Sequence, residues 1–329
     1  MRPRLDSAVA QARLLVRSTL SDLEPGALVL VALSGGPDSV ALAAVTAFEA
    51  PRAQLGWGAV VVDHQLQPGS AVVAASAAGQ ARQLGADPVD IVAVQVGTGG
   101  GPEAAARHAR HAALRDVAQA RGAAALLLGH TLDDQAENVL LGLTRGSGTR
   151  SLAGMATHDG LLRRAFLTLR RTQTKAICRA RGLTWYDDPH NADPAFTRSR
   201  VRARLLPVLE QELGPGIALG LARTAALARA DADLLDAQAV EVGVQAAAGD
   251  AAWRIDVLRD TPVALRSRVL RNAALAARCP ASALTAGHVA AISALIDDWH
   301  GQAGVDLPGR VRVVRAADRL RFEADGVAG

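Results

Sequence analysis

The chain has 329 residues and a mass of 34.0 kDa, and half of its residues are hydrophobic, so it can bury a substantial core and reaches the length of two domains. It has no run of ~18 to 20 apolar residues, as a membrane-spanning helix needs, and charges interrupt its start, which excludes a signal-peptide core and favours a cytoplasmic protein with no membrane partner. The two cysteines, Cys178 and Cys279, are too few and too far apart for a disulfide framework, a zinc finger or a CxxC redox pair.

The net charge of +4 is unevenly distributed along the chain. Residues 163–204 contain eleven basic and three acidic side chains, so this window carries +8 and the remainder of the chain carries −4. A general bias toward arginine would raise the charge everywhere, whereas a local excess is typical of a surface that binds a polyanion. On composition alone, a solvated charged face is an equally good interpretation.

The predicted elements alternate between short apolar runs and helical stretches. Strands are expected at 27–33, 57–63, 89–96 and 124–129, and the helices that follow them at 40–48, 71–84, 103–120 and 133–143. Four such units in succession predict an α/β fold with a doubly wound, mostly parallel sheet, in an N-terminal domain of residues 1–210. In such a sheet, ligands bind outside the carboxyl ends of the strands.

The composition changes after residue 205. Residues 217–244 and 263–277 are rich in Ala, Leu and Arg with helical spacing, and residues 301–323 contain short apolar alternations that indicate strands around turns. These patterns predict a second, smaller and mainly helical domain of residues 211–329, which ends in short strands.

The turn between the first predicted strand and helix, residues 34–39, has the sequence SGGPDS. Its glycines let backbone amides approach an anion, and Pro37 suits the first turn of a helix whose N-terminus attracts phosphate. An ordinary tight turn is the alternative. A Walker A loop is excluded because it needs Gly-Lys-Ser/Thr, and the only lysine of the chain, Lys175, lies elsewhere.

Two further loops follow predicted strands at the same edge of the sheet. Asp63 ends the second strand, and residues 129–137, GHTLDDQAE, follow the fourth. Asp134 and Glu137 share a helix face, where two carboxylates could receive a cationic substrate such as the amine of free lysine. The spacing from Thr131 to Asp134 also fits a capping box, which leaves a purely structural role open.

The SGGPDS turn resembles the SGGxDS loop of the N-type ATP pyrophosphatases, the PP-loop superfamily, which cleave ATP between its α and β phosphates. Over roughly residues 28–210 the chain is also similar to the tRNA(Ile)-lysidine synthase family. That resemblance rests on the segments VDHQLQPGS, GPEAAARHAR, GHTLDDQAENVLLGLTRGSG with LAGM, and WYDDPHNADPAFTRSRVRARLLP.

The resemblance implies a ligase that uses ATP to adenylate carbon 2 of the wobble cytidine in isoleucine tRNA with a CAU anticodon. L-lysine then displaces AMP and gives lysidine. The implied cofactors are ATP and Mg²⁺, and the resemblance leaves open whether the protein forms a homodimer. The competing interpretations are a tRNA thiolase, a PP-loop ligase of the kind that makes NAD, GMP or argininosuccinate, and a non-catalytic RNA-binding module.

The resemblance also assigns roles to individual positions. The implied ATP-binding residues are Ser34, Gly35, Gly36, Pro37, Asp38, Ser39, Asp63, His130, Arg145 and Gly146. Asp38 is expected beside Mg²⁺, because a carboxylate next to phosphates needs a cation between them. The implied catalytic residues are Asp38, Asp134, Glu137, Arg110 and Arg202, and the implied tRNA contacts are Arg198, Arg200, Arg202 and Arg204. Five positions depart from the residues usual in the family: Gln67, His111 (usually tyrosine), Asn138, His190 and Ser199.

Overall fold

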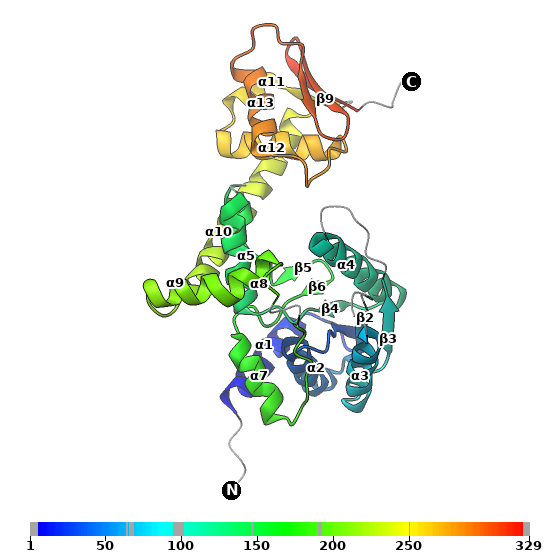
Figure 1. The fold of residues 1–329 in the computed structure, drawn as a ribbon. Helices are drawn as coiled ribbons and strands as arrows, with labels where there is room; N and C mark the ends of the chain where they lie inside the picture. The colour runs from blue at the N-terminus through cyan, green and yellow to red at the C-terminus, as the bar shows by residue number, and fades with distance from the viewer. Residues whose placement is uncertain are drawn as a thin grey trace. The chain divides into compact units, whose positions relative to one another are not determined.

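The computed structural model describes residues 6–63, 65, 69–94, 102–145, 148–189, 193–249 and 251–324, and for residues 102–104, 106 and 145 it describes the backbone alone. The chain divides into two compact units by its contacts (Figure 1). The first contains Met1–Leu141 and Gly154–Ala225, and the second contains Gly142–Ala153 and Ala226–Gly329.

A six-stranded sheet in the order β3-β2-β1-β4-β6-β5 forms the centre of the first unit. Its strands are β1 (Leu28–Ala32), β2 (Gly56–Asp63), β3 (Val89–Ala93), β4 (Ala125–Leu127), β5 (His158–Asp159) and β6 (Leu162–Arg163). All neighbouring strands run parallel except β5 and β6. The predicted doubly wound, mostly parallel sheet is confirmed.

The strand order explains where a ligand is expected. The chain proceeds from β1 outward through β2 and β3, and then returns to place β4 on the other side of β1. The carboxyl ends of β1 and β4 therefore flank the point at which the winding direction reverses, and open α/β sheets bind their ligands at such a point. The SGGPDS turn follows β1, and the GHTLDD segment follows β4.

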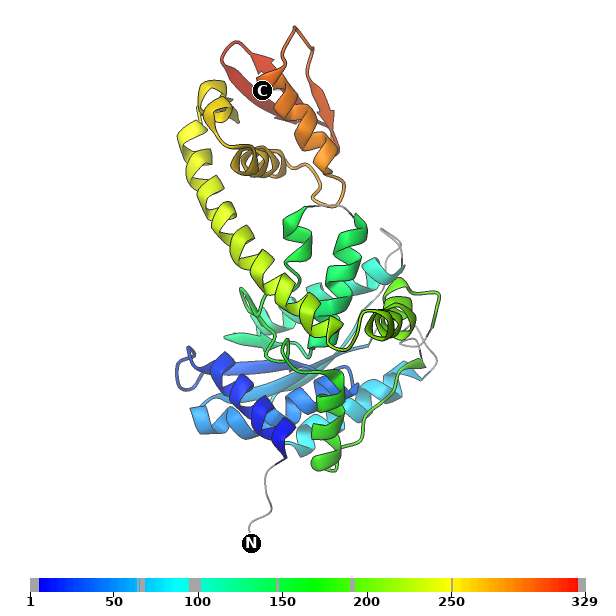
Figure 2. The same cartoon turned by 90° about the vertical axis from the view of Figure 1, so that its left-hand side faces the viewer.

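Helices cover both faces of this sheet. The helices of this unit are α1 (Ser7–Leu20), α2 (Pro37–Glu49), α3 (Ser70–Gln83), α4 (Pro102–Ala120), α5 (Leu132–Arg145), α7 (Arg171–Ala180), α8 (Thr197–Arg200) and α9 (Leu206–Glu212), with the short 3-10 helix η1 (Pro51–Ala53) and the π-helical segment η3 (Val201–Leu205). Helices α1, α2, α3 and α7 lie on one face and α4 lies on the other (Figures 1 and 2). Because both faces are covered, β1 reads as a continuous apolar run, with Val29 and Val31 packed on one face and Leu30 on the other.

Helix α5 has its own apolar contacts. Leu132 and Ala136 pack against Val201 and Leu206 of the segment from η3 to α9 and against Ala218. This packing fixes the rotation of α5 about its own axis.

The second unit combines helices with a four-stranded antiparallel sheet in the order β7-β10-β9-β8. Its elements are α6 (Thr149–Leu152), α10 (Ile217–Ala246, which begins in the first unit), β7 (Ala252–Arg254), α11 (Ile255–Asp260), α12 (Val263–Ala276), α13 (Ala286–Asp297), β8 (Val305–Leu307), β9 (Val311–Ala316) and β10 (Arg319–Ala324). Leu270, Ile292, Val313 and Leu320 belong to its own buried core. The predicted smaller C-terminal part with helices followed by strands is confirmed, while a domain boundary between residues 210 and 211 stays a prediction. Over the described ranges, no helix is both long and apolar enough to span a membrane.

Candidate active site

The SGGPDS turn forms a closed loop between β1 and α2. Gly35 has φ +80°, a conformation that side chains with a Cβ rarely adopt. The Ser39 hydroxyl accepts the N–H of Ser34 at 3.2 Å and donates to the carbonyl of Gly36 at 2.9 Å, and Pro37 opens α2. The first N–H groups of α2 have no partner within the helix. The loop therefore has the form of an anion site.

Neighbouring segments hold this loop in place. The N–H of Tyr186 donates to the carbonyl of Gly35 at 2.9 Å, and Trp185 packs against the core below. Gly129, directly after β4, lies so close that a Cβ there would be 3.0 Å from the nitrogen of Ser39. The glycine of the GHTLDD segment thus allows β4 to end directly against the loop.

Asp38 lies in the first turn of α2, next to the loop. Its Oδ2 accepts Nε of Arg171 at 2.9 Å, and the hydroxyl of Thr174 contacts its Oδ1. Burial raises the pKa of Asp38, although Arg171 and Thr174 act in the opposite direction. Arg171 and Thr174 both belong to α7, which the sequence analysis did not connect with the loop.

Asp134 and Glu137 lie on one face of α5, as predicted. The Oδ2 of Asp134 accepts both the N–H and the hydroxyl of Thr131 at 2.8 Å, so the capping box does form. Its Oδ1 accepts Arg171 at 2.9 Å and Arg202 at 3.2 Å. Glu137 accepts Nε and Nη2 of Arg202 at 2.6 and 3.0 Å and is fully buried. Asp134 therefore has both a capping role and a place in the site.

The surroundings of these two carboxylates shift their pKa values in opposite directions. Burial alone would raise the pKa of Asp134, but Arg171, His130, the Thr131 N–H and Arg202 outweigh it and lower that pKa. Burial raises the pKa of Glu137, and the negative charge of Asp134 adds to this rise. Asp134 is thus held as an anion, whereas Glu137 accepts a proton more readily.

The remaining polar residues of the DDQ segment are structural. Asp133 accepts the backbone N–H of Arg171 at 2.7 Å and Nε of Arg170 at 3.0 Å, which anchors the start of α7. The amide of Gln135 donates to the carbonyl of Met155 at 2.9 Å and accepts its N–H at 2.6 Å. This pair of bonds fastens the LAGM segment to α5.

A cavity of about 300 Å³ opens beside Glu137. Its polar lining includes Glu137, Glu210 and Arg202, and its apolar wall is Leu206, Pro207 and Ala218. Carboxylates and guanidinium groups around one cavity match a ligand that carries both an ammonium and a carboxylate, as a free amino acid does.

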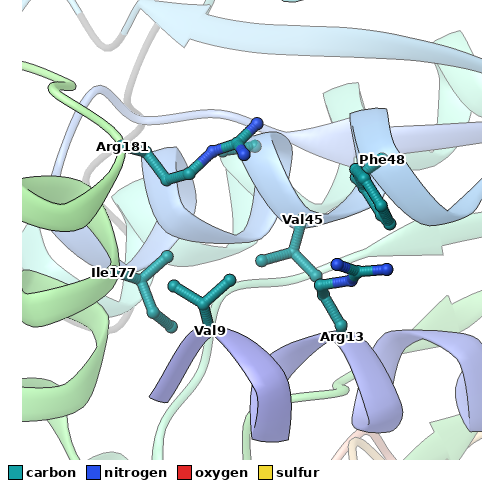
Figure 3. Close-up of a pocket in the computed structure, with 7 residues that line it drawn as sticks. Val9, Arg13, Val45, Phe48, Ile177 and Arg181 are labelled. Atoms are coloured by element: carbon teal, nitrogen blue, oxygen red, sulfur yellow. The ribbon is translucent and has the colours of Figure 1, made fainter. Parts of the chain in front are cut away.

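A second hollow lies between α1, α2 and α7 and is far smaller, about 20 Å³ (Figure 3). Val9, Val45 and Ile177 line it together with Arg13, whose guanidinium stacks on Phe48 and pairs with Glu49. It lies at the carboxyl-terminal half of α2, away from the loop at the opposite end of this helix. The cavity beside α5 is therefore the better substrate site.

Arg110 and His130 interact electrostatically with Asp134. Burial lowers the pKa of Arg110 first, and the charge of Arg198 adds to this, while Asp134 opposes it. Burial and nearby arginines also lower the pKa of His130, so its ring is neutral at pH 7. Among the described residues the buried Nδ1 of His130 has no hydrogen-bond partner. Both predicted residues thus face the same site as the carboxylates.

Asp63, which was also predicted to bind ATP, lies at the end of β2. It is buried and accepts the N–H of Gln65 at 2.9 Å. The side chain of Arg145 and the whole of Gly146 lie outside the described residues, as do Gln67 and His190. Of the predicted ATP-binding positions, the structure brings together the loop and His130, which directly follows Gly129.

Most basic side chains of residues 163–204 bond to groups within the first unit. Arg163 and Arg164 are buried, and Arg163 pairs with Asp22. The four predicted tRNA contacts differ: Arg198 bonds to Asn138, Arg200 to the carbonyls of Pro194 and Ala195, Arg202 to Glu137, and Arg204 is exposed. Much of the +8 charge consequently balances carboxylates of the protein itself.

Sequence reasoning missed Arg171 and Thr174. Arg171 is 133 positions from Asp38, so no local spacing could join them. The only available signal was the position of Arg170 and Arg171 at the start of a helix that follows the apolar stretch ending at Leu169.

The side chains near the loop offer few ligands for Mg²⁺. No group of three or more His, Cys, Asp or Glu that could hold a metal ion occurs in the part of the chain that the structure describes. Asp38 offers a single carboxylate next to the loop. Mg²⁺ commonly takes one or two carboxylates and completes its shell with water and substrate phosphates, so the donor set fits a cation that arrives with a nucleotide.

Comparisons with known proteins agree with this geometry. Residues 9–209 match the PP-loop domain family, and residues 254–321 match the TilS substrate binding domain. The chain is 55% identical over 317 residues to the tRNA(Ile)-lysidine synthase of Thermobifida fusca, covering 96% of this chain and 98% of that protein. It is 53% identical to the corresponding synthase of Streptomyces coelicolor, with 89% and 84% covered.

Among solved structures, the U34-tRNA thiolase NcsA from Methanococcus maripaludis shares the fold, with a TM-score of 0.56 over 66% of this chain and 78% of that chain at 19% identity. The sequence matches are far closer and extend over nearly the whole chain. A loop with the geometry of an anion site, carboxylates beside a cavity and a matching substrate-binding domain occur together here. The chain therefore belongs to the tRNA(Ile)-lysidine synthases, which are ATP-dependent ligases.

Proposed function

We propose that the protein converts the wobble cytidine of a CAU-anticodon isoleucine tRNA to lysidine, with ATP, Mg²⁺ and L-lysine. The observation that supports this best is Arg171, which lines the cavity with Glu137 and also bonds to Asp38 at the loop. In the first step the carbonyl oxygen at carbon 2 of cytosine attacks the α-phosphorus of ATP, and pyrophosphate leaves. In the second step an amine of lysine attacks carbon 2, loses a proton, and AMP leaves.

The loop and its helix are suited to the first step. Negative charge grows on the departing pyrophosphate, and the N-terminus of α2 with its unpaired backbone N–H groups can stabilise it. When bound, Mg²⁺ would neutralise phosphate charge next to Asp38. Arg110 lies close enough to Asp134 to interact with it and supplies further positive charge on the side of α4.

The carboxylates of α5 are suited to the second step. Asp134 remains an anion and can hold the ammonium of lysine, whereas Glu137 is the better proton acceptor because its pKa is raised. Arg202, which contacts both carboxylates, can also meet the carboxylate of the incoming amino acid.

The tRNA requires a larger surface than the cavity provides. The domain that matches the TilS substrate binding domain and the exposed arginines of the basic window, Arg200 and Arg204, are the proposed contacts for its backbone. Thiolation is disfavoured, because both cysteines are buried and burial raises the pKa of Cys178 to about 11.

The direct test is to incubate the protein with ATP, Mg²⁺, L-lysine and isoleucine tRNA bearing CAU, and to search for the lysine adduct on cytidine by mass spectrometry. We expect the adduct with the natural protein and with Asp116→Ala, a control on the exposed face of α4, and none with Asp134→Ala. Formation of AMP and pyrophosphate without the adduct would indicate a different PP-loop enzyme.

A further inference from the structure

The head group of Arg171 joins carboxylates that come from two different elements. Its Nε donates to Oδ2 of Asp38 on α2 at 2.9 Å, and its Nη2 donates to Oδ1 of Asp134 on α5 at 2.9 Å. Its Nη1 lies 4.0 Å from Oε1 of Glu137. One guanidinium thus neutralises the carboxylate on the nucleotide side and a carboxylate on the amine side at the same time.

The backbone below this head group is fixed at both ends. The N–H of Arg171 donates to Oδ2 of Asp133 at 2.7 Å. The hydroxyl of Thr174 lies 2.8 Å from the carbonyl of Arg171 and also contacts Asp38, and it can donate to one of them at a time. With the backbone held, the guanidinium can change partners only by rotating its side chain.

Arg202 offers a contrast within the same site. It bonds to Glu137 and Asp134, which are both on α5, and within the described part of the chain it bonds to no residue of the loop or of α2. Arg171 alone of these two arginines touches both halves of the site. Substitution of Arg202 therefore tests the effect of losing positive charge, whereas substitution of Arg171 tests the loss of the bridge between α2 and α5.

We propose that Arg171 is a positioning residue that couples nucleotide binding to lysine binding. This inference rests on the proposed function. Phosphates that arrive at the loop add negative charge beside Asp38, and a guanidinium favours paired hydrogen bonds to phosphate oxygens. Arg171 then turns toward the nucleotide and leaves Oδ1 of Asp134 with Arg202 as its only arginine, so this oxygen can accept the amine. Without nucleotide, Arg171 occupies that oxygen and lysine binds more weakly.

Coupling of this kind is reciprocal, so lysine must raise the affinity for nucleotide by the same factor. The test is calorimetric titration of L-lysine into the protein, with and without Mg²⁺ and a non-hydrolysable α,β-methylene analogue of ATP. We expect the analogue to tighten lysine binding by about five-fold or more. The quantity to compare is the ratio of the lysine affinity with the analogue to the lysine affinity without it. In Arg171→Lys this ratio falls to about one, because an ammonium lacks the fork that bonds two carboxylates in fixed directions.

Two control variants and a measurement of thermal stability show whether the effect belongs to Arg171 alone. Arg202→Lys weakens lysine binding with and without the analogue by similar factors, so the ratio persists. Arg121→Lys, at a paired arginine outside the site that bonds to Asp90 at 2.6 Å, changes neither affinity. Thermal unfolding identifies any variant that fails to fold, and Arg171→Met then serves as a second test of the lost ratio.

The outcomes distinguish the inference from the function on which it rests. Wild-type protein that binds lysine equally with and without the analogue, or Arg171→Lys protein that retains the ratio, overturns the coupling and leaves the proposed function standing. Wild-type protein that binds no lysine in either state overturns both.

Discussion

Asp134 and Glu137 are one helical turn apart, yet their neighbours shift the pKa values of the two carboxylates in opposite directions. Asp134 has two arginines on one oxygen and a capping threonine on the other, so it stays charged. Glu137 is deeper, bonds to Arg202 alone at short range, and has a raised pKa. Two carboxylates whose surroundings separate their pKa values are a common basis for distinct positioning and proton-accepting roles.

The first prediction uses matched changes from carboxylate to amide. Glu137→Gln should slow the attack of lysine on preformed tRNA adenylate by about 100-fold or more, since a general base contributes ~10²–10⁴. Asp134→Asn should mainly raise the lysine concentration needed for half-maximal rate. Single-turnover measurements on isolated adenylate separate the two effects. Equal losses in maximal rate for both variants would contradict this division.

The second prediction concerns His111, on α4. Burial first, and then the charges of nearby arginines, lower its pKa to about 4. The unfolded chain, with a histidine pKa of ~6.5, takes up this proton first, so stability falls as the pH drops from about 6.5 toward 4. Because His111 is only partly buried, screening by solvent reduces its contribution to this loss to about 1 kcal/mol between pH 7 and 5.

The check is urea unfolding of His111→Tyr, which does not titrate in this range. The free energy of unfolding of the variant should fall by about 1 kcal/mol less than that of the natural protein between pH 7 and 5. His130 shifts in the same direction and accounts for part of the remaining loss. Identical pH dependence in the two proteins would show that His111 is protonated equally well in the folded state.

At the scale of elements, the periodicity of apolar residues predicted the longer strands and helices. The predicted strand 27–33 is β1, Leu28–Ala32, and the predicted helix 40–48 is α2, Pro37–Glu49. Strands β5 and β6 have two residues each, too few for any period to be read. Asp134 and Glu137 could be found because their relation is local, whereas their link to Arg171 depends on how α7 packs.

The third prediction tests the contact between β4 and the loop. In Gly129→Ala the new methyl group would lie 3.0–3.1 Å from backbone atoms of Asp38 and Ser39, so the loop must shift. We expect nucleotide affinity, measured by calorimetry, to fall by ten-fold or more. Gly79→Ala in α3 is the control, because nothing lies within 4 Å of its Cβ position and alanine favours a helix by ~1 kcal/mol. Full affinity in Gly129→Ala would show that the loop tolerates the displacement.

At the scale of the whole molecule, the net charge of the basic window, residues 163–204, exceeds the positive charge that is exposed to a partner. Composition could locate the excess at residues 163–204, but whether each arginine faces solvent depends on the tertiary contacts. Arg163 is buried against Asp22 and Arg171 is enclosed by carboxylates, whereas Arg204 is exposed. A polyanion can therefore use only part of the +8.

The fourth prediction follows from that division. The affinity for tRNA should fall with salt, and each phosphate contact adds about one to the slope of log affinity against log salt. Arg204→Gln should reduce the slope by about one, as measured by filter binding between 50 and 300 mM salt. Arg52→Gln, an exposed arginine that bonds to the carbonyl of Phe48, should leave it unchanged. A slope that is flat in the natural protein would exclude the basic window as a tRNA contact.

The way the buried clusters are distributed along the sequence sets the order in which the enzyme takes shape on the ribosome. The core below the SGGPDS loop draws on residues from Ala8 to Cys178, so it can close as soon as α7 has emerged. The apolar face of α5 waits for Ala218, forty residues later. Since chains fold from the N-terminus during synthesis, the nascent protein completes the core below the loop, where we propose that nucleotide binds, before the face of α5 beside the proposed lysine cavity. The order of assembly is thus expected to repeat the order of the two chemical steps.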